Sequence, residues 1–196
     1  MAADKNFESY AAKDGVLVEN RTIPPEDGNV LDYSDILKFS NCTNATVDGC
    51  MIHGGTEDCI DIVRGSGYTF RNCTVFPFKN GITIKGSADG VLLENITIDG
   101  HGKDCDIDLG QFDNYWHIGR KPTRNIVIRN VQMANGSRVV IRTWDAEAPL
   151  IENSNVKLVK MPKILWWPYF VFRAIQTRGI RNLKKPVDSD TFISTT

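Results

Sequence analysis

Charged residues recur in the middle of the chain within runs of aliphatic residues, at spacings that could place their side chains on one shared surface. Asp61 has an isoleucine on each side, and Asp106 and Asp108 alternate with aliphatic residues in the same way. Lys85 and Arg142 each follow a similar aliphatic run. Because alternate residues of a strand face opposite sides, aliphatic side chains turned inward would leave these charges pointing outward. The sequence therefore predicts one outer face that carries Asp61, Lys85, Asp106, Asp108 and Arg142.

This combination of carboxylates and cations has three interpretations. The residues could carry out acid–base catalysis on a sugar chain, as paired carboxylates do in glycoside hydrolysis. Asp106 and Asp108 could instead supply hard oxygen ligands for Ca²⁺, the one cofactor that the sequence suggests. The charges could also form a solvated ladder of alternating sign that keeps the protein soluble. The residue types alone leave all three interpretations open.

An aromatic insertion offers a second candidate surface. The chain between Asn95 and Asn130 is 12 residues longer than the corresponding steps elsewhere. Insertions in a repeating structure emerge on one face, where they commonly bind a partner, although such a loop could also merely cap a groove. Aromatic rings provide flat surfaces on which sugars can stack. The candidate carbohydrate-binding residues are Tyr115, Trp116, His117 and Arg120 in the insertion, together with Trp144.

Recurring asparagines mark the elements that would position these side chains. Asn72, Asn95, Asn130 and Asn153 each begin a strand-like phrase, and the steps between them are 23, 35 and 23 residues. Gly49 occupies the equivalent place 23 residues before Asn72. A strand-rich repeat of this length predicts a solenoid in which each repeat forms one turn of a β-helix. We expect an all-β protein, a single-stranded parallel β-helix of about five to six coils.

Composition divides the chain into three parts. Residues 1–13 are polar and aperiodic, which predicts an N-terminal arm, and residues 14–160 carry the repeats of the β-helix. Residues 161–196 begin with a very aromatic stretch and end in a polar tail. Because a terminal coil exposes apolar side chains and unpaired backbone, we expect the aromatic stretch to cap the end of the solenoid or to bury itself in another subunit.

The overall composition narrows the class of function. The 196 residues carry a net charge of −1 without a basic stripe, which argues against nucleic-acid binding. The first residues lack the apolar core of a secretory signal, and no apolar run is long enough to span a bilayer. Five cysteines, an odd number, argue against a closed disulfide framework and indicate small apolar residues stacked inside the solenoid. We therefore expect a protein that is neither secreted nor membrane-bound.

Short phrases between Glu57 and Trp144 resemble those of the right-handed parallel β-helix proteins of the pectin-lyase-like superfamily. Within that superfamily, the chain is most similar to the polygalacturonase-type glycoside hydrolases. Their Asp-Asp-Cys, Gly-His-Gly and Arg-Ile-Lys phrases have counterparts, in the same order, in Glu57-Asp58-Cys59, Asn80-Gly81 and Val140-Ile141-Arg142. The resemblance implies a right-handed helix, a groove that faces carbohydrate, and a catalytic carboxyl at Asp58.

Several positions depart from the pattern of that family. The first carboxylate of the pair is Glu57, the histidine is replaced by Asn80, and the arginine and lysine are replaced by Val140 and Arg142. The family's Asn-Thr-Asp-Gly phrase has no counterpart beyond the single carboxyl of Asp35. The resemblance therefore implies the fold and the groove rather than a working polygalacturonase.

We expect the protein to be a component of a larger assembly, namely a bacteriophage tail or capsid-surface protein made in the host cytoplasm and located in the virion. Its partners would be other virion subunits, including copies of itself, held through the N-terminal arm and the C-terminal tail. One alternative is an extracellular polysaccharide lyase or glycoside hydrolase, with catalytic residues among Asp58, Asp61, Lys85, Asp106, Asp108 and Arg142. The other is a carbohydrate-binding module without turnover.

Overall fold

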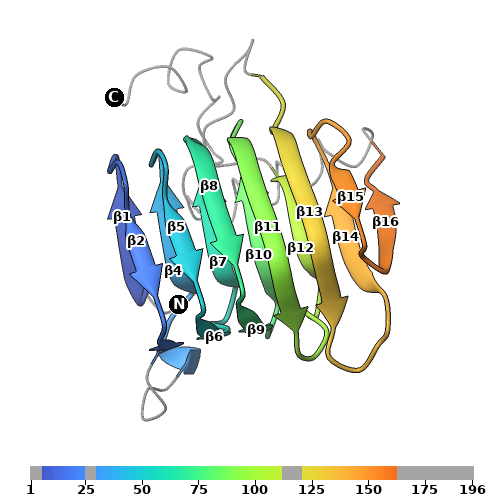
Figure 1. The fold of residues 1–196 in the computed structure, drawn as a ribbon, viewed down its shortest axis with the longest axis horizontal. Helices are drawn as coiled ribbons and strands as arrows, with labels where there is room; N and C mark the ends of the chain where they lie inside the picture. The colour runs from blue at the N-terminus through green and yellow to red at the C-terminus, as the bar shows by residue number, and fades with distance from the viewer. Residues whose placement is uncertain (1–5, 25–29, 112–120, 163–196) are drawn as a thin grey trace, which may run out of the picture.

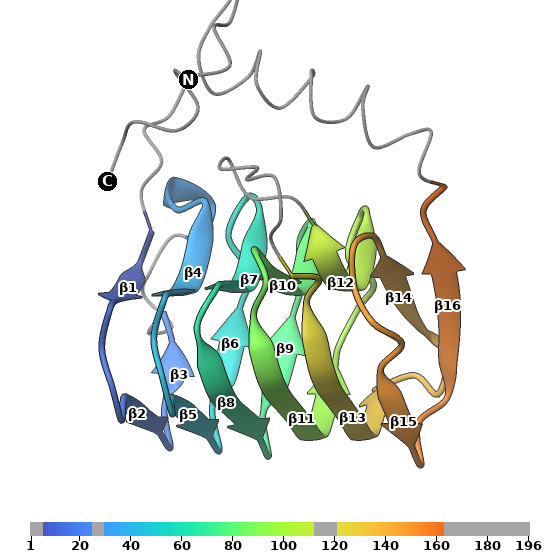
Figure 2. The ribbon, with the colours of Figure 1, turned by 90° about the horizontal axis from the view of Figure 1, so that it is seen from above.

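The fold consists of parallel strands arranged in two sheets. The computed structural model describes residues 6–24, 30–111 and 121–162. These residues contain one short 3-10 helix, η1 (Val30–Asp32), and no α-helix. Figures 1 and 2 show the two sheets lying on opposite sides of a common interior, with strands from distant parts of the sequence stacked side by side. The expected all-β class with parallel sheets is confirmed.

Sheet A holds one strand from each turn of the chain. Its order is β1 (Glu8–Ala11), β4 (Asp35–Ser40), β7 (Asp58–Val63), β10 (Asn80–Lys85), β12 (Cys105–Gln111), β14 (Val139–Thr143) and β16 (Val156–Lys160). Leu37 lies opposite Ile60, which in turn lies opposite Ile82. Ile107 and Ile141 continue this row into the later strands. Because the register keeps equivalent residues opposite one another, each position of the repeat becomes a row across the sheet.

Sheet B is formed by the second strand of each turn. Its members are β2 (Leu17–Glu19), β5 (Thr46–Asp48), β8 (Ser66–Arg71), β11 (Asp89–Ile98), β13 (Arg124–Met133) and β15 (Leu150–Glu152), with β3 (Thr22–Ile23), β6 (Met51–His53) and β9 (Thr74–Phe76) beside the second half of β11. The strand β11 pairs with β8 along its first half and with β9 along its second half. It therefore joins the two halves into one sheet.

The recurring asparagines form a column at the bend of sheet B. Asn72, Asn95 and Asn130 all have left-handed backbone conformations, with φ of 54°, 53° and 50°. Asparagine tolerates this conformation better than most residues. The side-chain amide of Asn130 donates to Asn95 Oδ1 at 2.8 Å, and that of Asn95 donates to Asn72 Oδ1 at 3.0 Å. The column thus turns the chain at the same place in successive turns.

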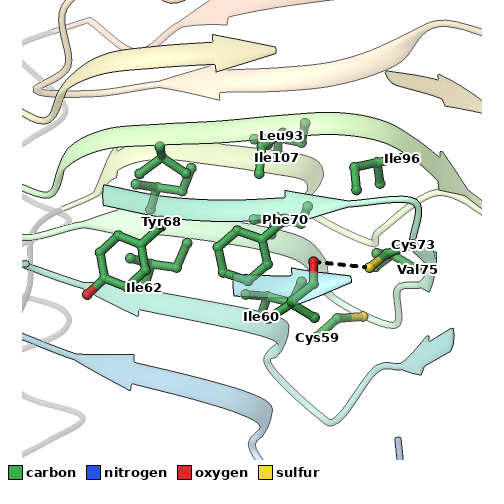
Figure 3. Packing of buried hydrophobic residues seen from close by; sticks show 14 of the residues in the cluster. Cys59, Ile60, Ile62, Tyr68, Phe70, Cys73, Val75, Leu93, Ile96 and Ile107 are labelled. Atoms are coloured by element: carbon green, nitrogen blue, oxygen red, sulfur yellow. Dashed lines mark hydrogen bonds between the residues drawn. The ribbon is translucent and has the colours of Figure 1, made fainter. Parts of the chain in front are cut away.

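The core lies between the two sheets. Figure 3 shows side chains of both sheets packed in one space, among them Ile60 and Ile107 from sheet A and Phe70 and Leu93 from sheet B. All four are fully buried, and burial of each such side chain stabilises the fold by roughly 1.5–3 kcal/mol. The five cysteines are also buried, and none forms a disulfide.

The boundaries of the stack differ from the expected ones at the N-terminal side. Residues 8–11 fall within the predicted arm, yet they form β1, which pairs in parallel with β4. Phe7 and Tyr10 also pack against the core, so these residues belong to the stack and the prediction of an arm is wrong for them. At the other end, the segment predicted to be a cap and tail lies outside the described residues after residue 162. Within the described ranges, no helix is long and apolar enough to cross a membrane.

Candidate functional site

A row of polar and charged side chains crosses the outer face of sheet A. The wall row, as we call it, is Lys38, Asp61, Thr83, Asp108 and Arg142, which lie opposite one another in register. The neighbouring aliphatic residues of each strand face the core, so these side chains point to the other side of the sheet. The structure thus brings Asp61, Asp108 and Arg142 together in one row.

The acidic members of the wall row are buried. Asp61 and Asp108 are 0% exposed, and so is Thr83 between them. A solvated ladder of charges would leave these side chains in water, so that interpretation is wrong for this face. Buried carboxylates need partners, because an isolated charge is strongly disfavoured in a low-dielectric interior.

Two lysines supply the partners of Asp61. Lys85 Nζ lies 2.9 Å from Asp61 Oδ1, and Lys38 Nζ lies 2.9 Å from Asp61 Oδ2. Lys38 Nζ also lies 2.8 Å from Asp35 Oδ2. The lysine side chains retain more exposure than the carboxylates, 26% for Lys38 and 11% for Lys85. The predicted residues Asp61 and Lys85 therefore form a direct ion pair.

Asp35, Asp58 and Asp61 converge at this point. Asp35 lies opposite Asp58 in the register of β4 and β7, and ligand oxygens of all three carboxyls lie within 4.8 Å of one another. Asp58 Oδ1 accepts hydrogen bonds from Asn80 Nδ2 and Thr83 Oγ1, both at 2.8 Å. We call Asp35, Asp58, Asp61, Lys38 and Lys85 the carboxyl cluster.

The members of the carboxyl cluster differ in acidity. Burial, with the nearby charge of Asp61, raises the pKa of Asp58 to about 7, and the same two causes raise the pKa of Asp35 to about 6. Burial alone would also raise the pKa of Asp61, but the ammonium groups of Lys85 and Lys38 hold it below its usual value. At mildly acidic pH the cluster therefore holds mostly protonated Asp58 beside ionised Asp61. Adjacent groups with pKa values displaced in opposite directions are suited to acid–base chemistry.

Arg142 and Asp108 form a second pair farther along the wall row. The Arg142 guanidinium donates to Asp108 Oδ2 at 2.5 Å and lies 5.5 Å from the centroid of the Trp144 ring. Burial raises the pKa of Asp108, although the charge of Arg142 opposes this effect. Trp144 is only 4% exposed, so its ring packs beside Arg142 and is not a surface on which a sugar could stack.

Asp106 faces a different set of partners from the wall row. It is 0% exposed, and its carboxylate accepts hydrogen bonds from the backbone of Gly102 at 3.0 Å and Val140 at 2.7 Å and contacts His101 Nδ1 at 3.0 Å. Asp106 therefore has its own hydrogen-bond partners, which are not members of the wall row. Calcium binding by Asp106 and Asp108 stays a prediction from the sequence.

Asp35, Asp58 and Asp61 could together hold a metal ion. They are the one group of three possible ligand side chains found among the described residues. Lys38 and Lys85 already place two ammonium groups against these carboxylates. Those cations supply the positive charge that a bound Ca²⁺ would supply, and they would repel the ion. The donor set therefore fits a proton-sharing cluster better than a metal centre.

The remaining predicted residues lie elsewhere. Tyr115, Trp116, His117 and Arg120 fall outside the described residues. Conversely, the outer face predicted from the sequence did not include Lys38 or Asp35, which the structure places beside Asp61. The signal was present, because Asp35 lies 23 residues before Asp58, and Lys38 lies 23 residues before Asp61. That step equals the repeat length, which brings such pairs opposite each other in the stack.

Comparisons with known proteins find no relative. No family model, no curated protein and no solved structure matches the chain.

Proposed function

We propose that the two sheets belong to a right-handed parallel β-helix and that the protein is a structural subunit of a larger assembly, such as a bacteriophage virion. The all-parallel pairing and the regular return of the chain to each sheet support a helix of this kind. The similarity of the short phrases to pectin-lyase-like proteins supports its right hand. The main support for an assembly is a surface on the outer face of sheet B.

An uncharged row runs across the outer face of sheet B from its first turn to its last. Its members, opposite one another in register, are Leu17, Thr46, Thr69, Leu92, Val127 and Leu150. Leu17 is 60% exposed and Leu150 is 55% exposed. A straight row of β-branched and aliphatic side chains on an open sheet suits contact with another protein surface. This row is the observation that carries the proposal.

The ends of the stack add a second kind of contact surface. In the described part of the chain, β16 pairs only with β14, and β1 pairs only with β4. Leu158 on β16 is 53% exposed. Strands with one partner present unpaired backbone groups that readily pair with further chain. The ends therefore favour assembly by stacking of subunits, in addition to contact along sheet B.

The oligomeric state in solution tests this proposal. Native mass spectrometry and light scattering of the full chain are expected to find an oligomer of this chain at micromolar concentration. The double substitution Leu17→Lys and Leu150→Lys should shift the protein toward monomer, because it places charges at both ends of the uncharged row. Phe78→Lys is the matched control, since Phe78 is 55% exposed but lies in the turn before β10. A wild-type protein that stays monomeric would overturn the proposal.

A glycoside hydrolase or polysaccharide lyase is the second candidate, and the carboxyl cluster favours it. Asp58 could donate a proton to a glycosidic oxygen while ionised Asp61 serves as base or nucleophile, as in enzymes that use two carboxyl groups. The carboxylates are at most 3% exposed, so a sugar could reach them only if the side chains that cover them moved aside.

Activity measurements distinguish the second candidate from the first. The full chain would be incubated with neutral and acidic polysaccharides, and new reducing ends and unsaturated products would be measured. If the cluster is catalytic, Asp58→Asn and Asp61→Asn should abolish turnover, whereas Asp48→Asn on the outer face of sheet B should not. Absence of turnover on every polysaccharide would leave the cluster with a structural role alone.

A further inference from the structure

A serine, a histidine and an aspartate lie in a hydrogen-bonded chain away from the carboxyl cluster. Ser137 Oγ lies 3.0 Å from His101 Nε2, and His101 Nδ1 lies 3.0 Å from Asp106 Oδ2. His101 belongs to the turn before β12, Asp106 to β12 itself, and Ser137 to the turn between β13 and β14. Two successive turns of the stack thus bring the three residues together.

Asp106 is well placed to orient the histidine ring. Its carboxylate is fixed from the other side by the backbone N–H groups of Gly102 and Val140. A carboxylate only accepts hydrogen bonds, so in the neutral ring the hydrogen lies on His101 Nδ1, which donates a hydrogen bond to Asp106. His101 Nε2 is then the acceptor and faces the hydroxyl of Ser137. This is the arrangement in which a histidine can act as base toward a serine nucleophile.

The hydrogen bonds that link Asp106, His101 and Ser137 lead from the interior to the surface. Asp106 is 0% exposed, whereas the His101 side chain is 44% exposed. Ser137 is half-buried and follows the exposed residues Asn135 and Gly136. A small molecule can therefore reach Ser137 Oγ without any opening of the stack, in contrast to the buried carboxylates of the carboxyl cluster.

We propose that Ser137, His101 and Asp106 form an acyl-transfer site that hydrolyses esters of small acyl groups. Ser137 Oγ attacks the ester carbonyl while its proton passes to His101 Nε2. The C–O bond of the ester breaks, and the departing alcohol takes the proton from His101. Water then gives a proton to His101 and its oxygen attacks the acyl-serine carbonyl. The bond between the acyl carbon and Ser137 Oγ breaks, Oγ takes the proton back from His101, and the carboxylic acid leaves. In this scheme Ser137 and His101 are catalytic residues, and Asp106 is a positioning residue.

The backbone around Ser137 indicates which esters the site is able to hydrolyse. The N–H of Ser137 donates to Asn135 Oδ1 at 3.0 Å, so it is engaged and does not point at a developing oxyanion. Preformed oxyanion donors contribute strongly to the hydrolysis of unreactive esters. The site is therefore suited to esters with good leaving groups, for which 4-nitrophenyl acetate is a direct probe.

Covalent labelling of the full chain tests the site independently of turnover. A fluorophosphonate is expected to add once per chain, and peptide mapping should place the label on Ser137. The same protein should hydrolyse 4-nitrophenyl acetate. Ser137→Ala should remove both the label and the hydrolysis, and His101→Gln should slow both by about 100-fold or more. Ser154→Ala is the matched control, because the Ser154 hydroxyl bonds only backbone groups of Glu152 and Val131 in the described structure.

The role of Asp106 has a separate readout. Asp106→Asn should lower kcat for 4-nitrophenyl acetate with little change in KM, because the ring of His101 would lose its fixed tautomer while the surface that meets the ester stays the same. Circular dichroism would show whether this variant keeps its strands. The proposal is overturned if the wild-type chain takes no label, if the label lies on another residue, or if Ser137→Ala hydrolyses the ester as fast as the wild type.

Discussion

The outer faces of sheets A and B carry charged rows with similar residues but very different exposure. In sheet A, Asp61 and Asp108 are 0% exposed. In sheet B, the Arg71–Asp48 pair has side chains that are 47% and 24% exposed, and Arg129 is 44% exposed between Glu94 and Glu152. Both faces use the same parallel register to align opposite charges. The register therefore explains the alignment, and the burial explains the difference in chemistry.

The comparison shows how one repeating backbone can support two kinds of ionic surface. Exposed ion pairs contribute little, because water screens them and long side chains lose freedom. Buried charges, in contrast, are strongly coupled to their partners and shift one another's pKa values. On this basis the exposed pairs of sheet B contribute little to stability, while the buried carboxyls of sheet A have strongly shifted pKa values.

The largest expected effect comes from removing the carboxylate that the two lysines share. Asp61→Ala would leave the ammonium groups of Lys38 and Lys85 without their common partner, which should destabilise the fold by about 3–5 kcal/mol. Urea unfolding followed by circular dichroism measures this effect. Asp48→Ala, which breaks an exposed pair of sheet B, is the control and should shift the urea midpoint only slightly. Equal shifts in the two variants would remove the distinction between the faces.

The second effect is a fall in stability as the pH rises. Because the pKa of Asp58 is raised to about 7 and that of Asp35 to about 6, the folded state keeps protons that the unfolded state releases near pH 4. Stability should therefore decrease between about pH 4 and pH 7, by an amount on the order of a few kcal/mol. Unfolding free energies measured across this range test the slope.

Asp58→Asn is the variant that sharpens this test. The amide oxygen can still accept from Asn80 and Thr83, but it cannot ionise. The variant should be more stable than the wild type at pH 8 and should show a flatter pH dependence. A slope identical to that of the wild type would mean that Asp58 does not carry the proton.

A smaller effect is expected at the bend of sheet B, where backbone conformation matters more than charge. Asn95→Ala should cost about 1–2 kcal/mol, because alanine is strained at a φ of 53°. Asn95→Gly should cost less, although it removes the same amide hydrogen bonds, since glycine adopts this conformation freely. Thermal unfolding of the two variants compares them directly. If glycine is the worse replacement, the amide column, not the backbone conformation, is the main contribution.

The smallest effect should follow from Arg129→Met, which removes both ion pairs of Arg129 with Glu94 and Glu152. The urea midpoint should decrease slightly at low salt, and the decrease should disappear at high salt because exposed pairs are screened. The effect of Asp61→Ala should persist under the same conditions. A salt-independent loss in Arg129→Met would show that sheet B is more tightly coupled than its exposure indicates.

Much of the fold could be predicted from the sequence. The asparagine repeat and the alternation of aliphatic with polar residues depend only on residues that are close together in the chain. The aliphatic pairs around Asp61 and Thr83 predict which side chains face the core, and the asparagine spacing predicts where the chain bends. With the register known, the alignment of Asp61, Asp108 and Arg142 follows. The N-terminal strand was missed because Glu8–Ala11 is short and polar, and it is ordered by its pairing with β4.

The chemistry of the site depended on contacts that the sequence does not encode locally. The alternation of residue types predicts that the Asp61 side chain points away from the core. It does not predict that the carboxylate is buried beside two lysines. The contact of His101 with Ser137 joins turns 36 residues apart, across the one irregular step of the repeat. Turn geometry of this kind is set by the stack as a whole, so the pair was not recognisable from spacing.

Alkylation of the buried cysteines can measure where the stack of strands opens. Thiol reagents need both access and a thiolate, and burial raises the pKa of Cys73 to about 11 and that of Cys59 well above its ordinary value. Cys42 and Cys50 lie in an early turn, and Cys105 lies in a later one. Pulsed alkylation followed by peptide mass analysis would therefore give the order in which successive turns separate, without an added probe.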